Sequence, residues 1–236
     1  MVRVKDPTIF GKPSGKMKNM VYRVMNGQSF ASKRPEKYNI SRSKAAVSQR
    51  SRFAVTIEFA KFINSIQVLS NIWKEAKISG TTSFNRIVKF NLKYVNEKSP
   101  AINNIITPAG CTKNLLYLPV NDLLFYPKEK IIKLSLFKIT DETIYNNIYD
   151  LVFVLLFFQP ANKKEKFFML DYKEENLRLT KETEEIIIDL DLTLLKKASK
   201  YNNLIIYFSA STFIGGSLKY LWTKPYAKEF FLGEII

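Results

Sequence analysis

The stretch DLVFVLLFFQ, residues 150–159, decides the fold class of this 236-residue chain. Between Asp150 and Gln159 every residue is apolar, and the run is rich in Phe and Val. It is about half as long as a membrane-spanning helix must be, and its composition is typical of a buried strand. We therefore predict a strand here, a sheet around it, and no membrane span.

Further short apolar runs lie on both sides of this stretch, with turn signals between them. Residues 133–136 and 188–192 alternate apolar and polar side chains, as half-buried strands do. Turns are expected at residues 127–128, 160–162 and 215–216. We predict an antiparallel β-sandwich of the immunoglobulin-like type, with strands at residues 115–120, 130–138, 150–159, 165–172, 185–195, 203–211 and 217–223.

Before residue 107 the apolar residues instead recur with a helical period. One helix is predicted over residues 42–66, with Phe53, Ile57 and Ala60 on its inner face. A short helix places Trp73 inward and stops before Gly80. A third helix follows a cap at Thr81 or Thr82, and its inner face carries Phe84, Ile87, Val88, Asn91 and Val95. Segment 36–96 is thus expected to hold about three helices.

Residues 20–34, MVYRVMNGQSFASKR, carry the clearest local signal. Asn26 and Gly27 tolerate the positive φ angles of a type I′ turn, so we predict a β-hairpin. An isolated hairpin is marginally stable in water, so it is expected to pack on the following helices. The chain is therefore predicted to be α+β, with a basic extended arm (1–19), a hairpin plus helical domain (20–106) and a β-sandwich domain (107–236).

Positive charge is concentrated at the N-terminus. Residues 1–53 contain thirteen Lys and Arg and two acidic residues, so they carry eleven of the sixteen excess positive charges. Basic side chains in the first turn of a helix oppose its macrodipole, so local stability does not explain Arg42 and Lys44. A solvated face is the simple interpretation; the alternative is a surface for a protein partner or nucleic acid, formed by Lys12, Lys16, Lys18, Arg23, Lys33, Arg34, Arg42, Lys44, Arg50 and Arg52.

One later segment is acidic. Residues 171–191 contain eight acidic and three basic side chains. A solvated face again explains this composition, and the spacing matches no calcium-binding loop. The alternative is an acidic docking patch on which the basic arm of a neighbouring copy lies, formed by Glu174, Glu175, Glu182, Glu184, Glu185, Asp189 and Asp191.

Composition excludes most kinds of catalysis. The chain has no histidine and one cysteine, Cys111, which excludes Ser-His and Cys-His catalysis, histidine metal sites and an intrachain disulfide. The eight glycines match no P-loop or dinucleotide-binding pattern. We predict no catalytic residue, metal or cofactor; an enzyme acting through carboxylates such as Glu184 and Asp189 is the remaining alternative. No Sec-type signal is visible, which predicts cytoplasmic synthesis and leaves the final location open.

Two short stretches of the sequence carry a resemblance to other proteins. The first, residues 14–54, carries Gly15, Lys16, Asn19, Val21, Asn26, Gly27, Arg34, Pro35, Ala45, Gln49, Arg50 and Phe53. In these positions it resembles the opening of an uncharacterised Bacteroidota protein family, a domain of unknown function. The ending Phe231-Leu232-Gly233 is similar to that family's Tyr-Leu-Gly ending, although Ala227 and Lys228 replace its usual Ser-Asn. The resemblance implies a basic hairpin-helix head and a β domain, and it implies no activity.

Two functions follow as hypotheses. The first is a non-enzymatic structural or assembly protein whose basic N-terminal head docks on a protein partner or a neighbouring subunit, in a filament, particle or virion-type assembly. The alternative is a sequence-tolerant nucleic-acid-binding protein that contacts phosphates through the same head. The sequence leaves open the partner, the symmetry and a cellular or viral origin.

Overall fold

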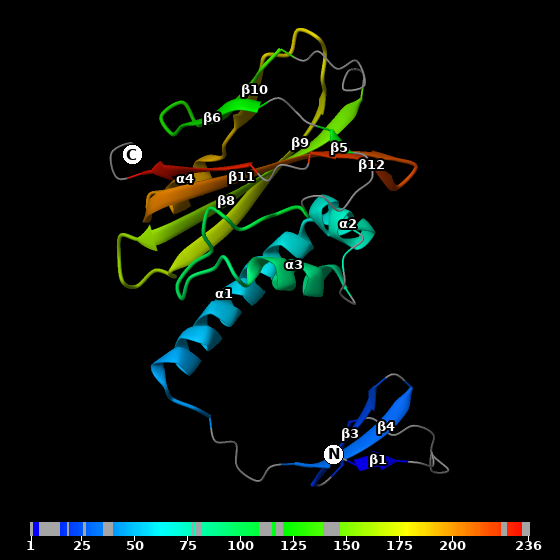
Figure 1. The fold of residues 1–236 in the computed structure, drawn as a ribbon. Coiled ribbons are helices and arrows are strands. Elements are labelled where there is room, and N and C mark those ends of the chain that lie inside the picture. The colour runs from blue at the N-terminus through cyan, green and yellow to red at the C-terminus, as the bar shows by residue number, and fades with distance from the viewer. Residues whose placement is uncertain are drawn as a thin grey trace. The chain divides into compact units, whose positions relative to one another are not determined.

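The structure, a computed structural model, describes residues 2–4, 15–17, 19–25, 27–34, 40–76, 78, 82–108, 115–116, 120–138, 147–222 and 226–232. The chain forms two compact units, Met1–Ala46 and Val47–Ile236. We call them the N-terminal unit and the C-terminal unit, and Figure 1 labels their helices and strands.

In its described part, the N-terminal unit is a four-stranded antiparallel sheet with strand order β1-β4-β3-β2. Its strands are β1 (Val2–Val4), β2 (Gly15–Met17), β3 (Met20–Met25) and β4 (Gln28–Lys33). The hairpin predicted over residues 20–34 is confirmed as β3 and β4, and Gly27 in its turn has a φ of 75°. The segment predicted as an extended arm contributes β1, which pairs with β4, and β2, which pairs with β3.

Helices follow, as predicted: α1 (Lys44–Ser65), α2 (Gln67–Glu75) and α3 (Ser83–Asn91). Thr82 caps α3, because its side chain accepts a hydrogen bond from the Asn85 backbone N–H at 3.2 Å. Trp73 on α2 is buried, as expected. The inner face predicted for α1 is wrong at Phe53, which is 49% exposed; α1 is buried instead along Val55, Thr56, Phe59, Ala60 and Ile63.

The central sheet of the C-terminal unit has six strands among the described residues, in the order β5-β12-β11-β8-β9, with β13 also on β11. These are β5 (Leu115–Leu116), β8 (Ile148–Pro160), β9 (Phe168–Arg178), β11 (Tyr201–Ile214), β12 (Ser217–Trp222) and β13 (Tyr226–Phe231). The long strands β8 and β11 pair antiparallel from Tyr201↔Pro160 to Ser211↔Asp150. The far edge of β11 is shared, with β13 along its first half and β12 along its second.

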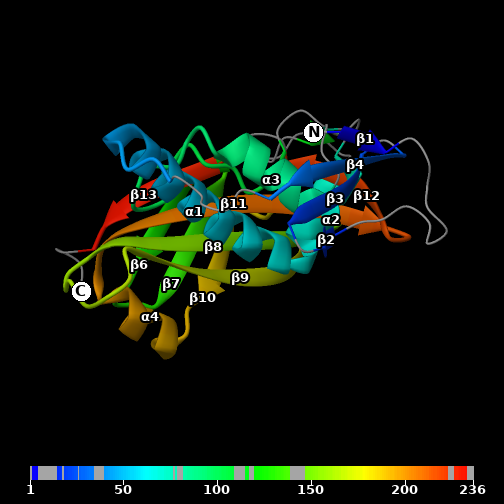
Figure 2. The same cartoon turned by 90° about the horizontal axis from the view of Figure 1, so that it is seen from below.

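Both faces of β8 are covered, which explains its uninterrupted apolar sequence. Val152, Val154 and Leu156 pack in one hydrophobic core with α1, α2 and α3. The alternate residues, including Phe153 and Leu155, pack in a second core with a smaller sheet, whose described strands are β6 (Val120–Tyr126), β7 (Ile131–Leu136) and β10 (Glu185–Asp189). The helices α1, α2 and α3 thus lie on one face of the central sheet and the small sheet lies on the other (Figures 1 and 2).

The predicted α+β class is confirmed, but the immunoglobulin-like sandwich is not. Two sheets do face each other, yet helices cover the second face of the larger one. In addition, β5 and β12 pair in parallel. The helices share a core with the central sheet. The chain therefore divides into its two compact units between residues 46 and 47, whereas the sequence suggested a boundary near residue 106.

Several strand predictions change. The strand predicted over residues 185–195 ends at Asp189, because α4 (Leu192–Ala198) begins there and buries Leu194 and Ala198 one turn apart. Of the strand predicted over residues 115–120, residues 115–116 form β5, residue 120 begins β6, and residues 117–119 lie outside the described part; β6 and β13 were not predicted. Finally, none of the described helices has the length and apolar content needed to cross a membrane.

Candidate binding surfaces

The N-terminal sheet divides the predicted basic residues between its two faces. Lys16 pairs with Val21, and Arg23 pairs with Phe30. Directly paired side chains share a face and alternate residues return to it, so Lys16, Arg23 and Phe30 lie on one face. Lys33 pairs with Met20 and lies on the opposite face. Arg34 follows β4, and Lys12 and Lys18 lie outside the described residues.

The basic residues around α1 also separate into two groups. Arg42, Lys44 and Arg50 are exposed at the start of the helix. The guanidinium of Arg52 instead donates hydrogen bonds to the carbonyls that follow α3: Nε to Val95 at 3.1 Å, and Nη2 to Leu92 and Lys93 at 3.3 Å each. Arg52 therefore ties α1 to the end of α3, a role that the sequence analysis did not foresee.

The predicted acidic patch does not form one surface. Glu174 and Glu175 are neighbours on β9, so their side chains point to opposite faces of the sheet. Lysines of the same unit engage two other members, with Lys133 Nζ 2.7 Å from Glu185 and Lys173 Nζ 2.6 Å from Asp191. The hydrogen bond that Lys133 donates to Glu185 raises the pKa of Lys133. The remaining members, Glu182, Glu184 and Asp189, are exposed on β10 and the turn before it.

Glu174 belongs to a different polar cluster, on the face of the central sheet that carries the helices. Glu174 is paired with Val152, so the two side chains share a face. Asp150 is two residues before Val152 on β8 and therefore lies on that face too. Burial raises the pKa of both carboxyl groups, and the charge of Asp150 raises that of Glu174 further. Ser209 and Ser211 share this face, and their buried hydroxyls have no hydrogen-bond partner in the described structure.

This face of the sheet thus carries two carboxylates and two hydroxyls, those of Asp150, Glu174, Ser209 and Ser211. Across the described ranges, no group of three or more His, Cys, Asp or Glu side chains is placed to hold a metal ion. Cys111 lies outside those ranges.

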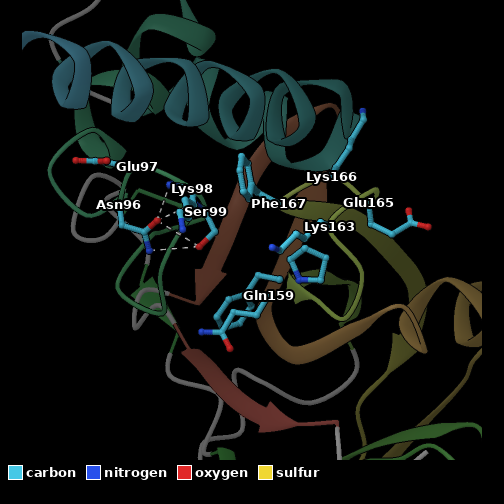
Figure 3. Close-up of a pocket in the computed structure, with 11 residues that line it drawn as sticks. Asn96, Glu97, Lys98, Ser99, Gln159, Lys163, Glu165, Lys166 and Phe167 are labelled. Carbon is cyan, nitrogen blue, oxygen red and sulfur yellow. Dashed lines mark hydrogen bonds between the residues drawn. The ribbon is translucent and has the colours of Figure 1, made fainter. Parts of the chain in front are cut away.

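A cavity of about 1050 Å³ opens between the turn joining β8 to β9 and the loop that follows α3 (Figure 3). Its floor is apolar, with Phe158, Pro160 and Phe167. Its rim carries Lys98, Lys163 and Lys166, together with the acidic residues Glu97 and Glu165. A second cavity, of about 340 Å³, shares Phe167 and Lys98 with the first.

Two local structures hold this rim in place. The Asn96 side-chain oxygen accepts hydrogen bonds from the backbone N–H groups of Lys98, at 2.9 Å, and Ser99, at 2.7 Å (Figure 3). Such an Asx turn fixes the direction in which the loop leaves α3. On the other side, Lys200 accepts a hydrogen bond at its carbonyl from the Ala161 N–H at 2.9 Å, and its amine lies 3.0 Å from Glu165.

This cavity was not predicted from the sequence. The turn at residues 160–162 was predicted, and it is followed by Lys163, Lys164 and Lys166 and by the aromatic pair Phe167 and Phe168. That local combination of cations and aromatic rings was the available signal. These lysines were not singled out, because the charge excess at the N-terminus is larger.

Comparison with known proteins identifies no relative of this chain. No family model, no curated protein and no solved structure matches this chain. The resemblance to the Bacteroidota family stays a prediction.

Proposed function

We propose that this chain is a non-enzymatic structural or assembly protein whose basic N-terminal unit docks on a protein partner or a neighbouring subunit. The observation that carries the proposal is that Met1–Ala46 forms a compact unit of its own. Domains below roughly 40 residues usually need a disulfide, a metal or a partner surface, because they bury too little area, and this unit is near that limit. Its sequence contains no cysteine, so a disulfide cannot supply the missing stability.

Charge and exposed apolar area support the same proposal. The N-terminal unit has eleven basic and two acidic residues, a density suited to steering a docking event. The first turns of α1, which follow in the chain, expose the apolar side chains of Val47 and Phe53 as well as the cations Lys44 and Arg50. Apolar side chains of this kind can provide the burial that holds a docked surface, while the cations set its orientation.

The test is the state of association of the full chain. We expect particles or oligomers in size-exclusion chromatography with light scattering, and a shift toward smaller species when Arg23 and Lys33 are changed to Gln. A matched variant, Lys128→Gln with Lys138→Gln, removes two exposed charges from the C-terminal unit and should associate as the wild type does. A strict monomer at both low and high salt would contradict the proposal.

A second function is favoured by one face of the N-terminal sheet. There Arg23 is paired with Phe30 and Lys16 lies on the same face, and cations with an aromatic ring are the combination that binds phosphates by charge and bases by stacking. Sequence-tolerant nucleic-acid binding would therefore use this face. Purified wild-type protein should then carry nucleic acid, seen in its absorbance ratio, and the variant Arg23→Gln should carry less. Clean protein with no shift of added nucleic acid on a gel would remove this alternative.

A further inference from the structure

The C-terminal unit has a basic and aromatic surface that neither proposed function uses. We call it the Phe167 groove and define it as the two cavities of about 1050 and 340 Å³ that share Phe167 and Lys98. It lies between the β8–β9 turn, the loop after α3 and the part of α1 that carries Ser51, Ala54 and Glu58. Figure 3 shows its larger cavity.

The lining of the groove carries three lysines. Lys98, Lys163 and Lys166 share it with three carboxylates, those of Glu58, Glu97 and Glu165. One of these, Glu165, is engaged by Lys200 at 3.0 Å, outside the lining of the cavity. Figure 3 shows the Glu165 carboxylate turned away and the Lys163 amine turned toward the side where Lys98 lies. In the described structure no carboxylate lies within ion-pair distance of Lys163 or Lys166.

The groove also displays an aromatic ring. Phe167 is 60% exposed, although burial is the usual fate of so large an apolar side chain. The Lys98 amine lies over this ring, 5.7 Å from its centre, so a cation and an exposed aromatic ring are in cation–π contact here. A ring that can stack on any base, beside amines that can contact phosphates, is how proteins bind single-stranded nucleic acid without sequence preference.

The size of the site agrees with this ligand. Its larger cavity is at the upper end of small-molecule sites, roughly 300–1000 Å³, and far exceeds the volume of one amino-acid side chain. The second cavity extends the surface past Phe167, so a ligand longer than one nucleotide has room on both sides of the ring. The Asn96 turn and the Lys200 contacts hold both walls before any ligand arrives.

We propose that the Phe167 groove binds a short segment of single-stranded nucleic acid. One base stacks on Phe167, and the flanking phosphates contact Lys98, Lys163 and Lys166. The site is independent of the N-terminal face on which Phe30 lies, so its failure and the failure of the proposed functions are distinguishable.

The experiment is a fluorescence-anisotropy titration of the full chain with a labelled oligothymidylate of about fifteen nucleotides. Salt is varied between about 50 and 200 mM. Phe167→Ala should weaken binding about tenfold through the loss of stacking, and Phe167→Trp should restore it. Because each phosphate contact on a single strand contributes about 0.7 to the salt slope, Lys163→Gln with Lys166→Gln should lower the slope by about 1.4.

The matched control is again Lys128→Gln with Lys138→Gln, which removes the same charge and should leave the slope unchanged. If this control changes the slope as much as the groove variant, only net charge matters and the proposal is wrong. It is equally wrong if wild-type protein does not bind the oligonucleotide at the lowest salt. Binding that survives Phe167→Ala but is lost with Lys16→Gln and Arg23→Gln would assign nucleic acid to the N-terminal face and none to the groove. Tighter binding of a polyglutamate peptide through the same groove residues would identify an acidic protein as the ligand, and would also overturn it.

Discussion

Asn91→Ala tests how the wall of the groove is attached to the fold. Asn91 ends α3 and is fully buried. Its amide nitrogen donates hydrogen bonds to the carbonyls of Ile87, at 3.1 Å, and Ile105, at 3.0 Å. Its side-chain oxygen accepts from the Ile105 N–H at 2.8 Å and from the Asn104 side chain at 2.9 Å. One amide therefore holds the loop of residues 96–106, which includes Lys98, against α3.

The cost of this substitution can be worked from its hydrogen bonds. Alanine removes all four and leaves the N–H and C=O of Ile105, and the amide of Asn104, without these partners. A hydrogen bond contributes about 1 kcal/mol net, and a buried group left unsatisfied costs more. We expect the free energy of unfolding to fall by about 3–4 kcal/mol, a large part of the 5–15 kcal/mol typical of a domain.

Urea unfolding followed by tryptophan fluorescence measures this loss. Asn103→Ala is the control, because Asn103 is exposed in the same loop and its removal should change stability by no more than about 0.5 kcal/mol. Asn104→Ala removes the partner amide, so the double variant should lose less than the two single losses added together. A loss below about 1 kcal/mol for Asn91→Ala would refute the network as the attachment of the loop.

Other predictions follow from single contacts. Raised carboxyl pKa values at Asp150 and Glu174 mean that protonation favours the folded state. Their contribution to stability is complete below the ordinary pKa values, 3.8 for Asp and 4.5 for Glu, and is lost as pH rises through the raised values. Asp150→Asn should therefore raise the melting temperature at pH 7 and change it little at low pH, and a thermal scan that shows no pH dependence of this difference would contradict the argument. Arg52→Met should destabilise the protein by about 1–3 kcal/mol in urea, because three carbonyls after α3 lose their donors, whereas an unchanged midpoint would show that water replaces the guanidinium. Phe153→Ala should cost about 3–5 kcal/mol, since this buried ring lies 4.8 Å from that of Phe208, and a smaller loss would mean that the core collapses around the cavity.

The elements that the sequence predicted are those whose signal is local. The apolar run in β8, the Gly27 turn and the Thr82 cap each depend on a few adjacent residues, and all three were found. A run buried on both faces does not say what covers each face, which is why helices on the central sheet were not foreseen. The strand predicted through residues 188–192 was too long for a related reason. The alternation of apolar and polar residues continues through Asp191, the N-cap of α4, and so short a helix has little periodicity of its own.

The candidate sites were harder to predict, because exposure is decided by distant contacts. Arg52 on α1 donates hydrogen bonds to carbonyls about 40 residues later in the chain, after α3, and nothing in the local sequence announces them. Lys98 and Phe167 come together only because β8 and β9 form a hairpin beside the loop after α3. One distant contact could be anticipated from the sequence. Asn91 is a polar residue on the inner face predicted for the third helix, and a buried amide must find hydrogen-bond partners.

The placement of the acidic residues also limits what the N-terminal unit can dock on. The negative excess of residues 171–191 is reduced by lysines outside that segment, since Lys133 engages Glu185 and Lys197 lies 3.2 Å from Asp171. Exposed pairs of this kind contribute little stability, but they lower the local field that would steer a basic partner to this surface. A neighbouring copy therefore offers the N-terminal unit a weaker docking site than a charge count suggests. Carbodiimide crosslinking tests this step, because a dominant product joining Lys16 or Lys33 of one copy to Glu182 or Glu184 of another would show that the acidic segment is the docking surface after all.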